Sequence, residues 1–163
     1  MTALHTPALL GQPRSRYQID CAGAQIHVHA RSLATILRID GEVDASNTDL
    51  ITDTIRGFSR LKAPLILDLA GLDFLAASGL RALLVLNEEH RQAGLRSSMV
   101  AGTVLHRLTR VVPDHGLPIA DSVAAALAHI EGVTAARRRL ASGPARQHEP
   151  QSDAKTRLRG LAS

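Results

Sequence analysis

Ser78 is the residue whose type and position offer chemistry most directly. It follows a buried-looking apolar run by one short turn and opens a leucine-rich segment, so it lies where a helix is expected to begin. The first N–H groups of a helix lack partners within the helix, so a serine there either caps them or, once phosphorylated, holds an anion near them. A phosphate of about −1.5 to −2 charges would repel an acidic or apolar partner docked there. The residue is therefore a cap or a switch, and on physical grounds the cap is favoured.

A catalytic role for Ser78 is not favoured. A nucleophile elbow has glycine two residues before the serine, where this chain has Ala76, and no oxyanion-hole motif accompanies it. Nothing in the sequence places His90, His106 or His115 beside the hydroxyl. The chain also lacks a Gly-rich phosphate loop with a following lysine and the Gly-x-Gly-x-x-Gly pattern. We therefore expect a protein that is not an enzyme.

Histidine and cysteine offer two further kinds of site. His27 and His29 share one face of an expected strand and could hold a metal with a third ligand, although an exposed strand face is the simpler interpretation. Cys21 is the only cysteine, so it forms no intrachain disulfide and no cysteine-based metal cluster. An oxidant-sensing thiol would need acidification, and only Arg16 lies nearby in sequence to favour it. We expect no metal and no cofactor.

The composition is that of one globular domain. The chain has 163 residues, of which 45% are hydrophobic and 21% are charged. A chain of this length can bury a stable core without disulfide bonds or structural metal ions. Aromatic residues make up 2%, too few for the stacking platforms that bind single-stranded nucleic acid. No apolar stretch approaches the roughly 18 residues of a membrane span, and Met1 to Tyr17 lacks a signal-peptide layout. These features predict a cytoplasmic protein.

Positive charge gathers at the C-terminal end of the chain. Up to Ile130 there are 12 Lys and Arg and 12 Asp and Glu, whereas from Glu131 onward there are 7 and 3, which accounts for the net charge of +4. We therefore predict a flexible arm over residues 1–16, a neutral domain over 17–132 and a basic, disordered tail over 133–163. The tail either contacts an acidic partner or RNA, or is simply solvated, and the solvated tail is favoured. The neutral domain is not expected to bind DNA.

Hydrophobic periodicity orders the elements that must position these residues. Strands are expected at 26–30, 35–40, 65–69, 98–101 and, briefly, 118–120. Helices are expected from Ser46, with Asp49 as its capping-box partner, then from Ser78 to about Gly94, from 103 to 112, and from 121 to a stop at Gly132. This alternation predicts an α/β fold, in which a mixed β-sheet of about four to five strands is covered by about four α-helices and the opening strand pair can be antiparallel.

Two motifs in this order resemble the STAS domain of bacterial anti-sigma factor antagonists. The first motif is Ile39-Asp40-Gly41-Glu42-Val43-Asp44. The second runs from Leu65 to Leu80 and contains Leu65-Ile66-Leu67-Asp68-Leu69 and Phe74-Leu75-Ala76-Ala77-Ser78-Gly79-Leu80. The resemblance covers about Ala24 to Gly132. The excess of arginine over lysine, 17 to 2, is compatible with a GC-rich bacterial genome.

The resemblance implies partner switching rather than catalysis. Proteins of this family bind an anti-sigma factor with a protein-kinase fold and so free a sigma factor. The kinase phosphorylates a serine at the start of the second helix, which breaks the complex, and a phosphatase restores it. Carried over to this chain, the partner-binding residues are Gly41, Glu42, Asp44, Ala76, Ala77, Ser78, Gly79, Leu80 and Arg81, with Asp68 ending the central strand.

The chain departs from the family pattern at the switch itself. The family usually reads Asp-Ser-Ser-Gly with the phosphoacceptor two residues before the glycine, and this chain has Ala76 and Ala77 at the first two positions. Ser78 is displaced by one helical position, or about 100°. Ser78 then replaces the phosphoacceptor, or the partner is bound without phosphorylation, or another input regulates it; we favour loss of the usual phosphoacceptor. The alternative function is a STAS subunit of a lipid or anion transporter or of a stress-signalling scaffold. Weak self-association is compatible with either function.

Overall fold

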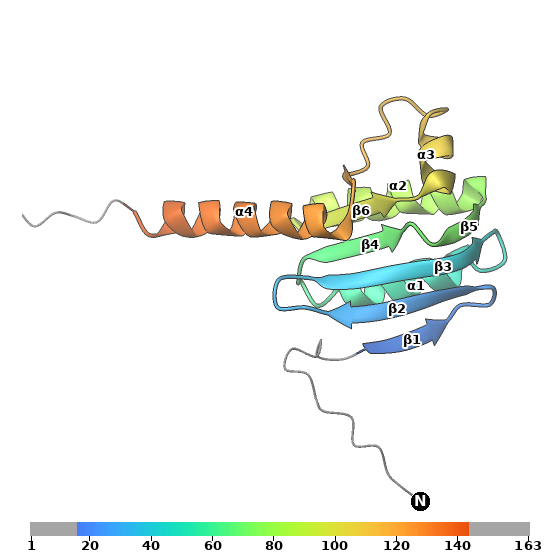
Figure 1. Ribbon diagram of the computed structural model, residues 1–163, viewed down its shortest axis with the longest axis horizontal. Coiled ribbons are helices and arrows are strands. Elements are labelled where there is room, and N and C mark those ends of the chain that lie inside the picture. Colours follow the sequence, from blue (N-terminus) through green and yellow to red (C-terminus); the bar gives the residue numbers. More distant parts are fainter. Residues whose placement is uncertain (1–15, 144–163) are drawn as a thin grey trace, which may run out of the picture.

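The computed structural model describes residues 16–143, which form one sheet and four helices (Figure 1). In chain order the elements are β1 (Arg16–Asp20), β2 (Ala24–Ala30), β3 (Thr35–Val43), α1 (Thr48–Ser59), β4 (Leu65–Leu69), β5 (Leu72–Leu75), α2 (Ala77–Gln92), β6 (Ser97–Ala101), α3 (Thr103–Thr109), β7 (Ile119–Ala120) and α4 (Val123–Ala141). The expected arm and the distal tail, residues 1–15 and 144–163, lie outside the described residues.

The sheet has seven strands, so the α/β mixed fold is confirmed and the expected count of four to five is too low. Its order is β1-β2-β3-β4-β6-β7, with β5 paired to the end of β3. β1, β2 and β3 form an antiparallel meander, whereas β3, β4, β6 and β7 run parallel. The strands missed from sequence are β1, in which the alternation of Tyr17 and Ile19 with polar residues is only five residues long, and β5, which has only four residues.

Two hydrophobic cores lie on the two faces of the sheet. The larger one packs against α1 and α2 and includes Leu65, Leu67 and Leu69 of β4. The smaller one lies under α4 and consists of Ala34, Ile36, Ile66, Val100, Ala126 and Ile130. Because β4 is covered on both faces, all of its side chains except Asp68 are apolar and buried, as the sequence predicted.

The start of α1 differs from the expectation. The helix begins at Thr48, and the Asp44 carboxylate accepts hydrogen bonds from the Ser46 backbone N–H at 2.7 Å and from the Ser46 hydroxyl. Ser46 therefore donates its hydroxyl proton instead of capping the helix, and the capping box predicted with Asp49 is wrong. Asp44 closes this turn, which makes it a structural residue as well as a candidate contact.

The last helix continues well past Gly132. α4 ends at Ala141, and Gly143, at a φ of +55°, takes the left-handed conformation that follows a helix. The stop predicted at Gly132 is wrong, and so is a disordered chain over residues 133–141. A lone glycine among Ala, Arg and Leu costs a helix only about 1 kcal/mol. Arg96 also donates from Nη1 to the Thr134 hydroxyl at 2.6 Å, which ties the extension to the sheet.

Candidate partner-docking surface

The pairing of β5 with β3 brings the two sequence motifs together. Glu42 lies opposite Phe74 and Val43 lies opposite Leu75 in parallel register. Directly after β5, the Ala76 N–H donates to the Val43 carbonyl at 2.8 Å. The β3 end and the α2 start therefore form one continuous surface, which we call the loop–helix surface and define as residues 41–44 and 76–81.

Two glycines permit this close approach. A Cβ at Gly79 would lie 2.9 Å from Val43 Cγ1 and 2.5 Å from Leu75 Cδ1, so only glycine lets α2 pack this tightly on β3 and β5. Gly41 has a φ of +98°, and a Cβ there would lie 2.5 Å from the Gly23 carbonyl oxygen. Both glycines thus position the surface through the backbone.

The expected contact residues divide by exposure. Glu42, Ala77 and Arg81 are exposed, while Gly41, Asp44, Ala76 and Ser78 are partly buried. Gly79 and Leu80 are buried. The last two support the loop–helix surface from beneath and do not present side chains to a partner.

Ser78 does not cap α2. The N-cap is Ala76, in extended conformation, so Ser78 is already the second helical residue. Its Oγ is buried and has no hydrogen-bond partner among residues 16–143. The cap favoured from sequence is therefore wrong, because the helix starts one residue before Ser78. Position 77 is the accessible one, and its side chain carries no hydroxyl.

Asp68 lies away from the loop–helix surface. It is the penultimate residue of β4 rather than its end, and it sits beside Arg38 in the parallel register with β3. Since Leu67 and Leu69 point into the larger core, Asp68 points to the opposite face of the sheet. Its Oδ1 accepts from the Ala70 N–H at 3.1 Å, which closes the turn toward β5.

An exposed row on α2 was missed from the sequence. Val85 is 46% exposed and follows Arg81 by one turn, on the side opposite Leu83 and Leu86. Phe74, opposite Glu42, is 49% exposed. A groove between α1 and α2 adjoins this row and is lined by Ala45, Thr48, Asp49, Thr52, Arg56, Ser78, Arg81, Ala82 and Val85. The sequence signal for this exposed row is Val85, an apolar residue on an otherwise polar side of α2.

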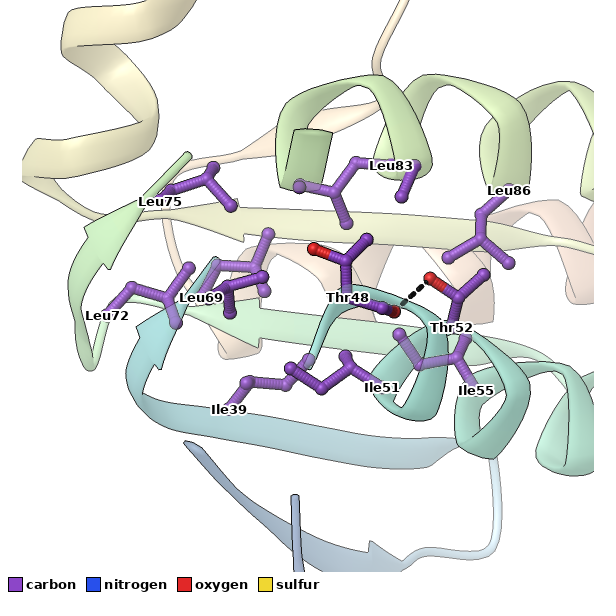
Figure 2. A pocket seen from close by; sticks show the side chains of 13 residues that line it. Ile39, Thr48, Ile51, Thr52, Ile55, Leu69, Leu72, Leu75, Leu83 and Leu86 are labelled. Atoms are coloured by element: carbon purple, nitrogen blue, oxygen red, sulfur yellow. Dashed lines mark hydrogen bonds between the residues drawn. The ribbon is translucent and has the colours of Figure 1, made fainter. Parts of the chain in front are cut away.

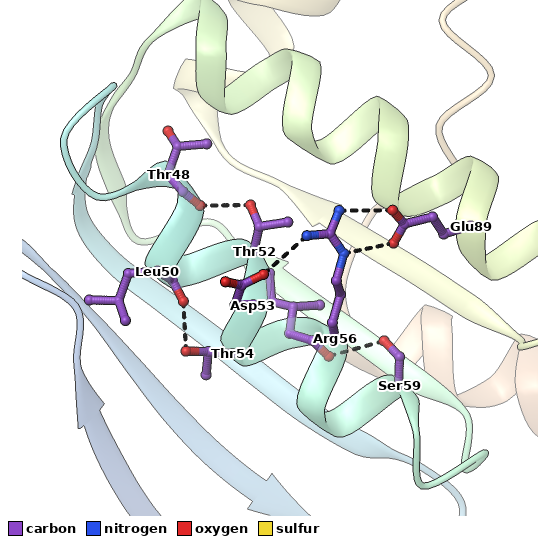
Figure 3. Close-up of polar contacts among 9 residues, drawn as sticks. Thr48, Leu50, Thr52, Asp53, Thr54, Arg56, Ser59 and Glu89 are labelled. Carbon is purple, nitrogen blue, oxygen red and sulfur yellow. Dashed lines mark hydrogen bonds and ion pairs between the residues drawn. The ribbon is translucent and has the colours of Figure 1, made fainter.

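Hydroxyl groups along α1 are used within that helix (Figure 3). The Thr52, Thr54 and Ser59 hydroxyls donate to the carbonyls of Thr48, Leu50 and Ile55, at 2.6, 2.8 and 3.0 Å. Each bond returns to the residue four positions earlier. These groups are therefore not oriented toward a substrate or partner.

The interior between α1, α2 and the sheet is closely packed. Figure 2 shows a cavity whose lining is apolar except for the threonines Thr48 and Thr52, and its volume is about 20 Å³. That is room for about one water molecule. The cavity does not accommodate an organic ligand.

The other residues singled out for chemistry have structural partners. His27 Nε2 lies 3.2 Å from Asp40 Oδ2, and Arg38 Nε lies 2.9 Å from Asp40 Oδ1. Within residues 16–143 no group of three His, Cys, Asp or Glu side chains is arranged to hold a metal ion. Cys21 is buried, and burial raises the pKa of its thiol, which disfavours the reactive thiolate.

The comparisons with known proteins agree with this architecture. The model of the STAS domain family matches residues 25–126. Osmosensory protein A of Mycobacterium tuberculosis is 34% identical over 127 residues, which cover 75% of this chain and 80% of that protein. Because the family match spans residues 25–126 and the identity to this relative is 34%, both indicate a common family and not only a common fold.

Solved structures share the fold at lower identity. An anti-sigma factor antagonist from Mycobacterium paratuberculosis superimposes with a TM-score of 0.57 at 22% identity, covering 66% of this chain and 94% of that one. The murine anion transporter Slc26a9 gives 0.52 at 15%, covering 63% of this chain and 18% of the transporter. None of the helices in residues 16–143 has the length and apolar character needed to cross a bilayer. Together the family match, the curated relative and the fold show that this chain belongs to the STAS domain family.

Proposed function

We propose that this protein is an anti-sigma factor antagonist, which binds an anti-sigma factor of protein-kinase fold and thereby releases a sigma factor for transcription in the bacterial cytoplasm. The observation that carries the proposal is the joining of residues 41–44 to the start of α2 by the Ala76–Val43 hydrogen bond at 2.8 Å. The shared fold with the mycobacterial antagonist supports it. The protein acts by binding and not by catalysis.

The proposed partner is bound without the family's usual phosphorylation switch. At the position where the resemblance implies a phosphoserine, Ala77 is exposed and has no hydroxyl. The neighbouring Ser78 Oγ is buried, although the residue lines the groove between α1 and α2, so we do not expect a kinase to modify it while α2 is folded. The loop–helix surface then stays small and uncharged at this point, which corresponds to a permanently binding-competent state.

A pull-down from the native bacterium, with the full-length protein as bait, tests the proposed partner class. Recovery of a kinase-fold anti-sigma factor, identified by mass spectrometry, supports the antagonist function. Recovery of a membrane permease or a signalling scaffold without any anti-sigma factor contradicts it and supports the alternative, a transporter or scaffold subunit. That alternative is favoured by one observation, the fold shared with the Slc26a9 transporter.

The Ala77→Asp variant tests the proposed surface. Aspartate at the first helical position suits the helix dipole, so the fold is retained while a charge enters the interface. We expect the affinity for the recovered anti-sigma factor to fall at least about tenfold, since a buried unpaired charge in an interface costs about 2 kcal/mol or more. Ala128→Asp, at an exposed position of α4, adds the same charge elsewhere and serves as the control. Equal affinity of wild type and Ala77→Asp would show that the surface is misplaced.

Phosphorylation by the recovered kinase tests the loss of the switch. The wild-type chain is expected to take up no phosphate at Ser78, whereas Ala77→Ser, which restores a hydroxyl at the accessible position, is expected to be modified. A phosphate on Ser78 of the wild-type chain would instead show that the switch is displaced by one residue.

A further inference from the structure

A basic groove lies between the end of α2 and the middle of α4. Its lining includes Asn87 and Arg91 of α2, His129, Val133 and Arg137 of α4, and Leu95 and Arg96 just before β6. Ala77 and Arg91 are 14 residues apart on α2, or about 21 Å. The groove is therefore separate from the loop–helix surface, and both can be occupied at once.

The charge in this groove has one sign. Three arginines and a histidine line it, and no aspartate or glutamate does. Arg91 is paired with Glu88 at 2.6 Å, so its charge is largely neutralised. Arg137 forms no ion pair with residues 16–143, and within the same range Arg96 hydrogen-bonds only to the neutral Thr134 hydroxyl. Two guanidinium groups, Arg96 and Arg137, thus face the groove without a carboxylate.

The spacing of the basic groups indicates an extended anion. His129, Val133 and Arg137 recur every four residues along one side of α4, so the ends of this row are about 12 Å apart. Lining residues spread over this length match a ligand that extends along the groove better than a single phosphate or sulfate. They match a chain of charges that follows the groove.

The shape and lining select among extended anions. The basic residues line a concave groove, whose shape fits an extended chain better than the convex phosphate surface of a nucleic-acid duplex. Single strands are bound through stacked bases, and none of the lining residues is Phe, Tyr or Trp. Leu95, Pro118, Ile130 and Val133 instead provide apolar surface between the cations. A peptide segment in which apolar and acidic side chains alternate would match such a lining.

We propose that this groove binds an extended acidic segment of a protein partner, one that carries apolar side chains between its carboxylates. Arg96 and Arg137 pair with the carboxylates, and the apolar residues contact the intervening side chains. The interaction is independent of the proposed anti-sigma factor docking at Ala77, so one STAS domain can hold two partners or two segments of one partner.

The test uses the full-length chain and a fluorescent ten-residue peptide of alternating Glu and Ala, measured by fluorescence anisotropy. Replacing Arg96 and Arg137 together by Gln is expected to weaken binding about tenfold, and Arg137→Gln alone about threefold. Because the Arg137 side chain is exposed and forms no ion pair within residues 16–143, that single variant is expected to leave the fold intact. Binding is also expected to weaken as salt rises from about 0.05 M to about 0.5 M.

Matched variants distinguish the groove from general positive charge. Arg107→Gln with Arg110→Gln, at the exposed C-terminal end of α3 and the residue after it, removes the same charge and is expected to leave the affinity unchanged within about twofold. Arg157→Gln with Arg159→Gln does the same for the C-terminal end of the chain. Equal loss in any of these control pairs overturns the proposal, as does equal binding of a Gln-Ala peptide. Tighter binding of a single-stranded oligonucleotide than of the acidic peptide overturns it in favour of nucleic acid.

Discussion

Arg56 of α1 donates two parallel hydrogen bonds to the carboxylate of Glu89 on α2, from Nε to Oε2 at 3.0 Å and from Nη2 to Oε1 at 2.8 Å (Figure 3). Its third nitrogen, Nη1, lies 3.1 Å from Asp53 Oδ1 of the preceding turn. The Glu89 carboxylate raises the pKa of Arg56, and the guanidinium lowers the pKa of Glu89. This bidentate pair fixes the distance between the two helices that border the loop–helix surface.

We predict that Arg56 and Glu89 are energetically coupled by about 1 kcal/mol, at the upper end for partly exposed pairs, because the pair is bidentate and joins two helices. A double-mutant cycle with Arg56→Gln and Glu89→Gln, followed by urea denaturation, measures it. The control is the Arg91–Glu88 pair, which is also bidentate but is more exposed and lies within α2, so it should couple by about 0.3 kcal/mol. Equal coupling energies in the two pairs would contradict the role of Arg56 and Glu89 in fixing the distance between α1 and α2.

Acid is expected to destabilise the protein through His90. Its ring is buried, and its Nε2 lies 2.7 Å from the Ser59 hydroxyl, which itself donates to Ile55. Nε2 is therefore the donor, and Nδ1 is left without a partner among residues 16–143. Burial lowers the pKa of His90, an effect that the negative charge of Glu89 partly opposes. A proton on Nδ1 would be buried without an acceptor.

The sign of the pH effect follows from this lowered pKa. The unfolded histidine binds a proton below about pH 6.5 while the folded one stays neutral, so the free energy of unfolding should decrease as pH falls from about 7 to 5. His90→Gln should remove part of that slope, measured by urea denaturation at each pH. Arginine partners lower the pKa values of Glu88 and Glu89, so the contribution of these two residues to the free energy of unfolding is lost only below about pH 4.5. An unchanged slope between pH 7 and 5 in His90→Gln would exclude this assignment.

Gly79→Ala should separate α2 from β3. The new methyl group would overlap Leu75 Cδ1 and Val43 Cγ1, so we expect a loss of about 1 to 3 kcal/mol in unfolding free energy, together with weaker binding at the loop–helix surface. Gly57→Ala is the matched control, because that glycine lies within α1 with no atom within 4 Å of the added Cβ. The control should gain about 0.5 to 1 kcal/mol, and a similar gain at Gly79 would contradict the packing described.

Gly132→Ala should reinforce the extension of α4. Nothing lies within 4 Å of the added methyl, and the residue is helical, so hydrogen exchange of the backbone N–H groups of residues 133–141 should slow by about threefold to fivefold. Gly143→Ala, at a φ of +55°, should instead loosen the last turn. Faster exchange in Gly132→Ala would show that the helix does end near this glycine in solution.

The sequence predicted what depends on periodicity and on local motifs. Leu80, Leu83 and Leu86 marked the buried side of α2, and the apolar run 65–69 marked a strand covered on both faces. The resemblance also implied partner-binding residues in segments 41–44 and 76–81; the fold places the two segments in contact, and their binding to a partner stays a prediction. These features repeat over several residues or form a recognisable pattern, so no single position decides them.

Features that depend on tertiary contacts were not predicted. β5 has four residues and exists because it pairs with the end of β3. Ser46 and Ser78 both occur where a cap is expected, yet the Ser46 hydroxyl donates to Asp44 and the buried Ser78 Oγ has no partner among residues 16–143. Gly132 ends no helix, because the surrounding residues and the Arg96–Thr134 bond outweigh its low helix propensity. In each case a neighbour distant in sequence, or a one-residue shift, decides the outcome.

The central position of β3 also bears on the order in which the chain folds. On one side β3 joins a meander whose strands are connected by short turns, so β1, β2 and β3 pair after closing only small loops. On its other side β3 pairs with β4 and β5 only after α1 has crossed over, which closes a larger loop at a greater entropic cost. We therefore expect the meander to assemble first on an emerging chain, and the loop–helix surface to be complete only once β5 and α2 have followed.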